Sequence, residues 1–76
     1  MKTASKPLKV FGRNLARLRS SHGITQEALA ERAEIHARYL QKLEGGAGHP
    51  SLVVLGRLKR ALGCQWNELL DKVETL

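Results

Sequence analysis

Hydrophobic positions recur along the first third of the chain at the three- and four-residue spacings of an amphipathic helix. The series consists of Leu8, Phe11, Leu15 and Leu18. Pro7, just before it, suits a first helical turn. Gly23 suits a left-handed cap, so the segment from Ser21 to Gly23 ends the pattern. We therefore expect a first helix that begins near Pro7 and ends near Ser21.

The next two segments each begin with a helix-start signal. Thr25 is a good N-cap, and Ile24 before it can pack against Leu29 as a hydrophobic staple. The same arrangement returns eleven residues later around the cap position His36. The two predicted helices are Gln26–Ala33 and Ala37–Glu44.

The second half of the chain contains a loop and two further predicted helices. Residues 45–50 are rich in glycine and end in Pro50, which predicts a loop. Ser51 can cap a helix over 52–62, and Gly63 can end it. Apolar residues at helical spacing predict a last helix over 66–73. The chain is therefore expected to be all-α, with five helices and no strand.

The helices over 26–33 and 37–44 are joined by three residues, so they must cross steeply. A steep crossing needs a small residue where the backbones approach, and Ala30 supplies it. The apolar residues that can fill the wedge beside it are Leu29, Ala33, Ile35, Leu40 and Leu43. This combination predicts a helix-turn-helix.

The net charge of the chain indicates what kind of partner it binds. The 76 residues include 13 Lys and Arg against 7 Asp and Glu, a net charge of +6 that suits a polyanion. The excess lies at the amino end, where residues 1–23 contain no acid. We expect residues 1–7 to form a flexible basic arm before a domain over 8–76. Lys2 and Lys6 of this arm either contact the DNA backbone or serve solubility, and the sequence leaves both open.

Other chemistry is poorly supported. Cys64 is the only cysteine, and no apolar run is long enough for a signal peptide, so we expect a cytoplasmic protein without membrane contact. The three histidines share no metal-ligand spacing. We expect neither an enzyme nor a cofactor.

The stretch TQEALAERAEIHARYLQKLEGG, followed by HPSL, resembles the lambda-repressor-like (Xre-type) helix-turn-helix family. The resemblance covers roughly residues 10–70. Its most specific elements are Thr25-Gln26-Glu27, Leu29-Ala30, Leu40 to Glu44, Gly46 and Pro50-Ser51. Among single-domain members, the controller proteins of restriction-modification systems are the most similar around HARYLQKLE. The resemblance implies a compact five-helix DNA-binding domain.

In such a unit the second helix lies in the major groove, with its amino-terminal residues at the base edges. The candidate base-reading residues are Ala37, Arg38, Gln41 and Lys42. Arg38 can pair with guanine, Gln41 with adenine, and Ala37 can pack on a thymine methyl. Lys42 suits either guanine or phosphate.

The resemblance also implies roles outside base reading. Gln26 at the start of its helix is expected to contact the DNA backbone, with His36 and Tyr39 as phosphate neighbours. Arg19 and Glu44 match a family pair that joins the first helix to the end of the third, so we interpret them as structural.

The sequence departs from the family pattern at several positions. Glu34 stands in the inter-helix turn, where glycine is usual and where a positive φ would strain any other residue. Gly45, Ala47 and Gly48 replace loop residues that are often basic. Lys59 and Gly56 replace a small and a bulky residue, respectively.

A core this small leaves apolar residues for an interface, so we expect a twofold homodimer on a palindromic site. The candidate interface residues are Val53, Trp66, Leu69 and Val73, for which ordinary core closure is the alternative. RNA polymerase is a further candidate partner of such a transcriptional regulator. A DNA-binding antitoxin of a toxin-antitoxin pair and a protein-interaction adaptor remain as rival functions.

Overall fold

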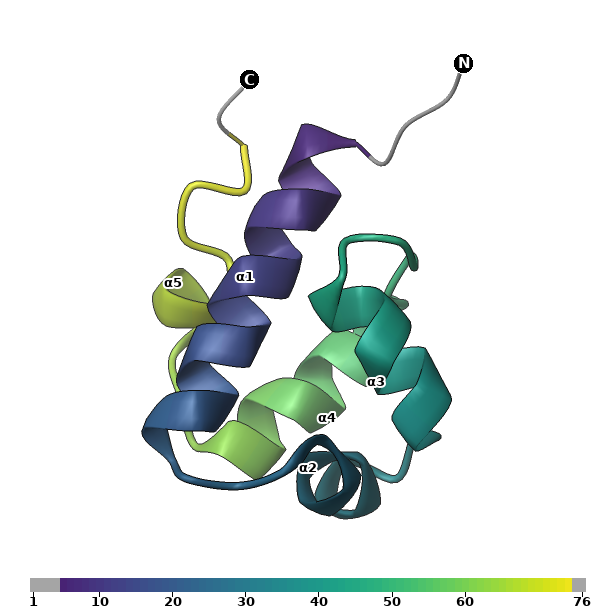
Figure 1. Ribbon diagram of the computed structural model, residues 1–76. Coiled ribbons are helices and arrows are strands. Elements are labelled where there is room, and N and C mark those ends of the chain that lie inside the picture. Colours follow the sequence, from purple (N-terminus) through teal and green to yellow (C-terminus); the bar gives the residue numbers. More distant parts are fainter. Residues whose placement is uncertain (1–4, 75–76) are drawn as a thin grey trace.

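The computed structural model describes residues 5–74 and contains five helices, with no strand in that range (Figure 1). They are α1 (Lys6–Ser21), α2 (Gln26–Ala33), α3 (Ala37–Glu44), α4 (Leu52–Leu62) and α5 (Trp66–Leu69). The long α1 runs between α5 on one side and α3 on the other, with α4 behind and α2 below (Figure 1). The all-α prediction is confirmed, and α2, α3 and α4 have their predicted bounds.

α1 begins earlier than the hydrophobic pattern indicated. Ser5 caps it, because its hydroxyl oxygen accepts a hydrogen bond of 3.2 Å from the backbone N–H of Leu8. Lys6 and Pro7, which were expected in a flexible arm, therefore lie in the first helical turn. Lys2, the other expected arm residue with a DNA role, lies outside the described residues.

The predicted caps of α2 and α4 are present. The hydroxyl of Thr25 accepts from the N–H of Ala28 at 3.0 Å, and that of Ser51 accepts from the N–H of Val54 at 3.1 Å. Gly23 and Gly63 adopt the expected left-handed conformation, with φ of 68° and 64°. Local capping chemistry thus fixes where α2 and α4 begin and where α1 and α4 end.

α5 is shorter than the expected helix over 66–73, since it ends at Leu69. The side-chain Nδ2 of Asn14 on α1 donates to the carbonyl of Leu69 at 3.1 Å and to that of Asp71 at 2.9 Å. Beyond this point Lys72 has a φ of 61°, which a helix does not allow. The buried Asn14 therefore anchors the start of the turns over 70–74 through long-range bonds that hydrophobic spacing could not reveal.

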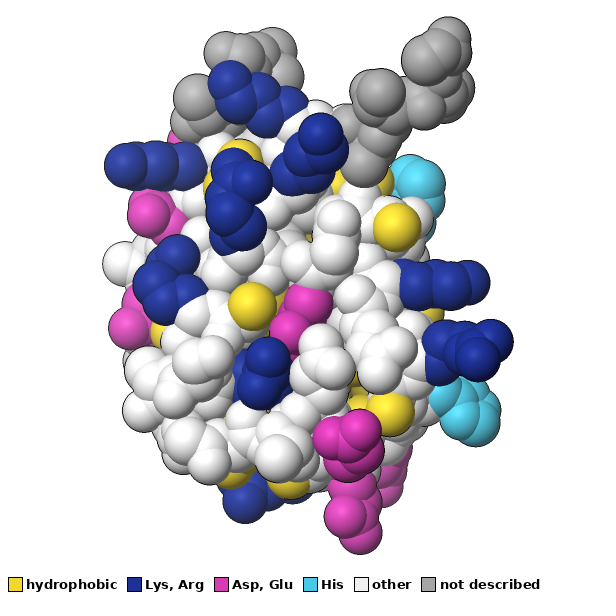
Figure 2. Space-filling model, viewed as in Figure 1, with side chains coloured by type: hydrophobic (Ala, Val, Ile, Leu, Met, Phe, Trp, Pro, Cys, Tyr) yellow, Lys and Arg dark blue, Asp and Glu magenta, His cyan; other side chains and the backbone are white. Residues whose placement is uncertain are grey.

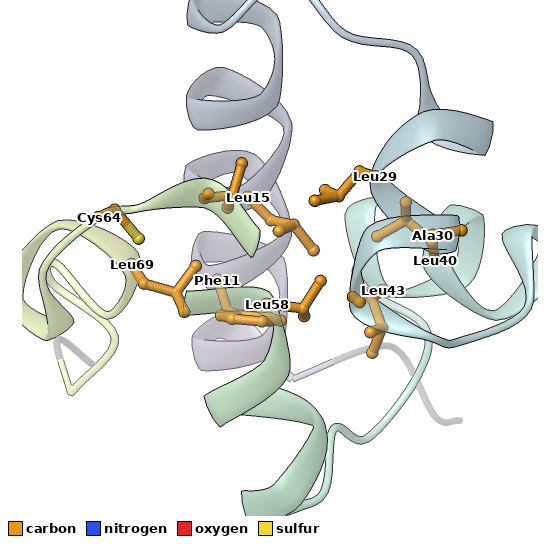
Figure 3. Close-up of a cluster of buried hydrophobic side chains, with 11 residues drawn as sticks. Phe11, Leu15, Leu29, Ala30, Leu40, Leu43, Leu58, Cys64 and Leu69 are labelled. Carbon is orange, nitrogen blue, oxygen red and sulfur yellow. The ribbon is translucent and has the colours of Figure 1, made fainter. Parts of the chain in front are cut away.

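The core gathers side chains from every helix (Figure 3). Its buried hydrophobic residues are Phe11, Leu15, Leu29, Ala30, Ala33, Leu40, Leu43, Leu58, Leu62, Cys64 and Leu69. Leu69 was expected at a dimer interface, but it is fully buried here and belongs to the core. Burial also raises the pKa of the Cys64 thiol above its ordinary value, so the thiol is neutral at neutral pH.

Among the glycines, Gly12 of α1 lies closest to another backbone segment. A Cβ at this position would come within 2.5 Å of the carbonyl oxygen of Leu43 and 2.6 Å of that of Glu44. Only glycine fits between α1 and the end of α3. Ala30, the small residue predicted at a helix crossing, is buried as well, whereas the role of Gly12 was not predicted. None of the helices between residues 5 and 74 is long and apolar enough to cross a membrane.

Candidate nucleic-acid interface

α3 has one apolar face and one polar face. Leu40 and Leu43 are buried in the core. Arg38, Gln41 and Lys42 are exposed on the other side. Figure 2 shows Lys and Arg side chains projecting from the edge of the molecule where α3 lies. The polar face can therefore approach a duplex without disturbing the core.

The amino-terminal end of α3 borders a surface hollow of about 390 Å³. Its lining residues are His36, Ala37, Arg38, Tyr39 and Lys42. The structure thus brings three of the four predicted base-reading residues to one hollow together with both expected phosphate neighbours. Gln41 lies exposed on the same helix but does not line the hollow.

Tyr39 and His36 differ in how firmly they are held. The Tyr39 hydroxyl donates to the carbonyl oxygen of His49 at 2.9 Å, which ties α3 to the loop that follows it. His36 occupies the N-cap position, as expected, but its side chain makes no capping bond and is exposed. The backbone N–H groups at the start of α3 are therefore not all satisfied by a side chain, a situation that favours anion binding.

The expected ion pair between Arg19 and Glu44 is present and joins α1 to the last residue of α3. The Arg19 Nε lies 2.7 Å from Glu44 Oε2, and Nη2 lies 3.1 Å from Oε1. Nη1 of the same guanidinium donates to the carbonyl of Ile24 at 2.9 Å. The hydrogen bond to Glu44 raises the pKa of Arg19 above its already high value, so the guanidinium stays charged.

Gln26 takes part in this network, which the sequence analysis did not predict. Its Nε2 donates to Glu44 Oε1 at 2.9 Å. Gln26 is the first residue of α2, and Glu44 is the last of α3. They are eighteen positions apart in the sequence, so the fold and not a helical spacing brings them together. Gln26 therefore sits at the helix end expected for a backbone contact, with its amide already oriented by Glu44.

The turn between α2 and α3 contains Glu34, where the family resemblance predicted backbone strain. Glu34 has φ of 58° and ψ of 46°, in the left-handed region that favours glycine. Its carbonyl oxygen accepts a hydrogen bond from Arg57 Nη1 at 3.4 Å. The turn that orients α3 therefore requires a left-handed backbone conformation that is unfavourable for Glu34.

A second exposed region lies on α4 and the start of α5. The exposed large hydrophobic residues of the described chain are Leu52, Val53 and Trp66, at 81%, 63% and 42% exposure. Lys59 Nζ lies 5.6 Å from the centre of the Trp66 ring, which accounts for a lysine at this position. Val73, another expected interface residue, is partly buried against the core.

The arrangement of these helices agrees with comparisons to known proteins. A family model described as "Helix-turn-helix domain" matches residues 10–72, more than four-fifths of the chain. The chain belongs to the helix-turn-helix family of transcriptional regulators. The lambda-repressor-like resemblance is thereby confirmed, together with the fold that it implied.

Two curated relatives resemble this helix-turn-helix domain over most of its length. The uncharacterised HTH-type transcriptional regulator y4dJ of Sinorhizobium fredii is 40% identical over 66 residues, which cover 87% of this chain and 86% of the relative. Control protein C.BamHI of Bacillus amyloliquefaciens is 33% identical over 63 residues, which cover 82% and 78%.

A solved structure shares both the sequence pattern and the fold. The restriction-modification controller protein C.AhdI of Aeromonas hydrophila superposes with a TM-score of 0.83 at 34% identity. The match covers 86% of this chain and 98% of C.AhdI. The helix-turn-helix domain described here therefore corresponds to nearly the whole of that protein.

Proposed function

We propose that this protein is a sequence-specific regulator that binds double-stranded DNA as a homodimer and controls transcription from the site it occupies. The observation that carries the proposal is the polar face of α3, where Arg38, Gln41 and Lys42 are exposed above a buried Leu40 and Leu43. A helix of this kind can enter the major groove and present these side chains to base edges. Ala37, partly buried at the start of the helix, would pack on a thymine methyl.

Backbone contacts would fix the register of α3 in the groove. Gln26, oriented by Glu44, would donate to a phosphate from the start of α2, and His36 would do so from the cap of α3. Tyr39 lines the same hollow, and its aromatic ring would meet the sugar-phosphate edge while its hydroxyl remains bonded to His49. Lys6, exposed in the first turn of α1, would add a further phosphate contact.

The dimer would form through the exposed apolar residues Leu52, Val53 and Trp66, which the partner would cover as one patch. Gly56 lies on the same helix, and a Cβ there would meet nothing within 4 Å, so a second α4 could approach closely at this position. Isologous contact of this patch would relate two α3 helices by a twofold axis. Val73 would contribute at its margin.

The similarity to C.BamHI and C.AhdI supports a narrower assignment. One is named a control protein and the other a restriction-modification controller protein. We propose the same class for this chain, acting in the cytoplasm at promoter DNA, where RNA polymerase is the partner it would meet.

Selection of bound sequences from a pool of random duplexes tests the proposed function. We expect an enriched palindrome whose half-sites have centres about one helical turn, roughly 10 base pairs, apart. A single unrepeated half-site would contradict the dimer, and a pool without enrichment would contradict sequence-specific binding.

A further inference from the structure

Four cations form a row along the exposed face of α1. The row consists of Lys6, Lys9, Arg13 and Arg17, spaced by three, four and four residues, and all four are exposed. We call it the α1 stripe. The whole of α1 contains no acidic residue. The stripe lies on the side of α1 that faces away from the buried Phe11 and Leu15.

No salt bridge within residues 5–74 neutralises the charges of the α1 stripe. The salt bridge between Arg19 and Glu44 is the one found within residues 5–74, so no carboxylate of that range lies within 4.0 Å of a stripe cation. Like charges three and four residues apart on a helix destabilise it. The isolated domain therefore gains nothing from this arrangement, whereas a polyanion would turn it into a binding surface.

The stripe also borders a surface hollow of about 320 Å³. Lys6, Arg13 and Arg17 line it from α1, and Lys72 adds a fourth cation from the turn after α5. Asp71 is the one carboxylate in the lining. The buried Asn14 also lines the hollow, and its bonds to the carbonyls of Leu69 and Asp71 attach the turn after α5 to α1. The position of Asp71 and Lys72 beside the α1 cations is therefore fixed.

The position of the stripe relates it to α3. The Cα of Lys9 lies 3.0 Å from where a Cβ of Gly46 would stand, so one margin of the stripe adjoins the loop that leaves α3. In Figure 2 cationic side chains gather over the part of the molecule where α1 and the C-terminal turn lie, apart from the group over α3. The stripe thus adjoins the loop that follows α3 at Lys9 and continues along α1.

We propose that the α1 stripe is a second, sequence-independent surface for DNA phosphates that lie outside the bases read by α3. This proposal rests on the proposed function. The eleven helical steps from Lys6 to Arg17 rise by about 16 Å along the axis, a distance over which a duplex carries roughly ten phosphate charges. An acidic protein partner is less well matched, because the exposed large hydrophobic anchors of the described chain all lie on α4 and α5.

The phosphates could come from two sources. A duplex seated on α3 would reach the stripe where its flank bends toward Lys9 and the α3–α4 loop. Alternatively, the stripe would hold a separate duplex, so that one protein bridges two DNA segments. The chemistry is the same in both cases, and only the connectivity of the DNA differs.

Arg13→Gln, compared with Arg32→Gln, tests the stripe. Both remove one charge from an exposed arginine whose side chain makes no hydrogen bond within residues 5–74, but Arg32 lies on α2, away from the stripe. Binding is measured against salt concentration on a minimal duplex that carries only the selected operator and on the same operator with long unrelated flanks. A pull-down of labelled minimal operator by an immobilised unrelated duplex measures bridging.

If flanks supply the phosphates, the wild type and Arg32→Gln bind the long duplex with a steeper salt dependence than the minimal one. Arg13→Gln lowers the logarithmic slope on the long duplex by about 1 per protomer, and Arg13→Lys restores it. If a second duplex supplies them, Arg13→Gln loses bridging instead. Equal behaviour of Arg13→Gln and Arg32→Gln in both arms overturns the proposal. Failure of the wild type to bind the minimal operator is a separate result, which overturns the proposed function and the stripe proposal with it.

Discussion

Arg19 holds Glu44 through two hydrogen bonds, of 2.7 and 3.1 Å, and thereby fastens the end of α3 to α1. The Glu44 side chain is only 7% exposed and also accepts from Gln26 on α2. The Glu44 carboxylate therefore connects α1, α2 and α3 at the C-terminal end of α3. The orientation of the polar face of α3 depends on this connection.

Glu44→Ala is expected to destabilise the domain by about 3 kcal/mol, because it leaves the Arg19 guanidinium partly buried without its counter-charge. Equilibrium unfolding in urea measures the change. Glu31→Ala removes a carboxylate that is exposed on α2, and it should change stability by no more than about 0.5 kcal/mol. Equal effects of the two substitutions would show that the pair contributes nothing beyond a surface charge.

Glu34→Gly is expected to stabilise the fold by about 1 kcal/mol, since glycine adopts the observed φ of 58° without strain. The gain is read from the urea midpoint. Glu34→Ala is the matched control, because it removes the same carboxylate but keeps a Cβ and therefore the strain. A midpoint that rises equally in both variants would assign the effect to charge rather than to backbone conformation.

Gly12→Ala is expected to lower stability by about 1 to 3 kcal/mol, because the new Cβ would press against the carbonyl oxygens of Leu43 and Glu44. Gly56→Ala supplies the contrast within another helix. A Cβ at Gly56 has open space around it, so in the monomer this change should raise stability by up to about 1 kcal/mol. Thermal or urea unfolding of both variants checks the pair, and a stable Gly12→Ala protein would contradict the close approach.

Val53→Asp is expected to weaken the dimer, because it places a charge in an apolar patch that would be buried between protomers. Sedimentation equilibrium over a range of concentrations measures the association. Ser20→Asp adds the same charge at an exposed position of α1 and should leave association unchanged. A Val53→Asp protein that still dimerises like the wild type would place the interface elsewhere.

Local signals predicted most of the fold. Thr25 and Ser51 mark helix starts, and Gly23 and Gly63 mark helix ends, through bonds within a few residues of each. The same local chemistry could have placed the start of α1 at Lys6, since Ser5 precedes a proline-containing first turn. Features of this kind can be predicted from sequence because cause and effect lie in one segment.

Features that depend on contacts between distant segments were missed or misassigned. Asn14 shortens α5 across 55 residues of sequence, and nothing in its neighbourhood signals that partner. Leu69 shares the helical spacing of Trp66, but packing buries Leu69 and leaves Trp66 exposed. The mid-helix glycine at position 12 was the available sign of a close approach, although it does not say against which helix.

In the candidate site, too, local features could be predicted from the sequence and contacts between distant segments could not. The exposed row on α3 follows from helical periodicity alone, so Arg38, Gln41 and Lys42 could be named from the sequence. The bond from Gln26 to Glu44 could not, since it connects two different helices. Sequence thus identified the side chains that would meet the bases, and the structure added what orients them.

The central claim, that the exposed face of α3 reads bases, is tested most directly by comparing Arg38→Ala with wild type on two duplexes. Dissociation constants are measured at one salt concentration for the selected operator and for a scrambled duplex of equal length and composition. We predict a loss of about 1 to 3 kcal/mol on the operator, relaxed preference at one base pair, and little change on the scrambled duplex. Equal losses on both duplexes would make Arg38 a phosphate contact and would contradict base reading by this residue.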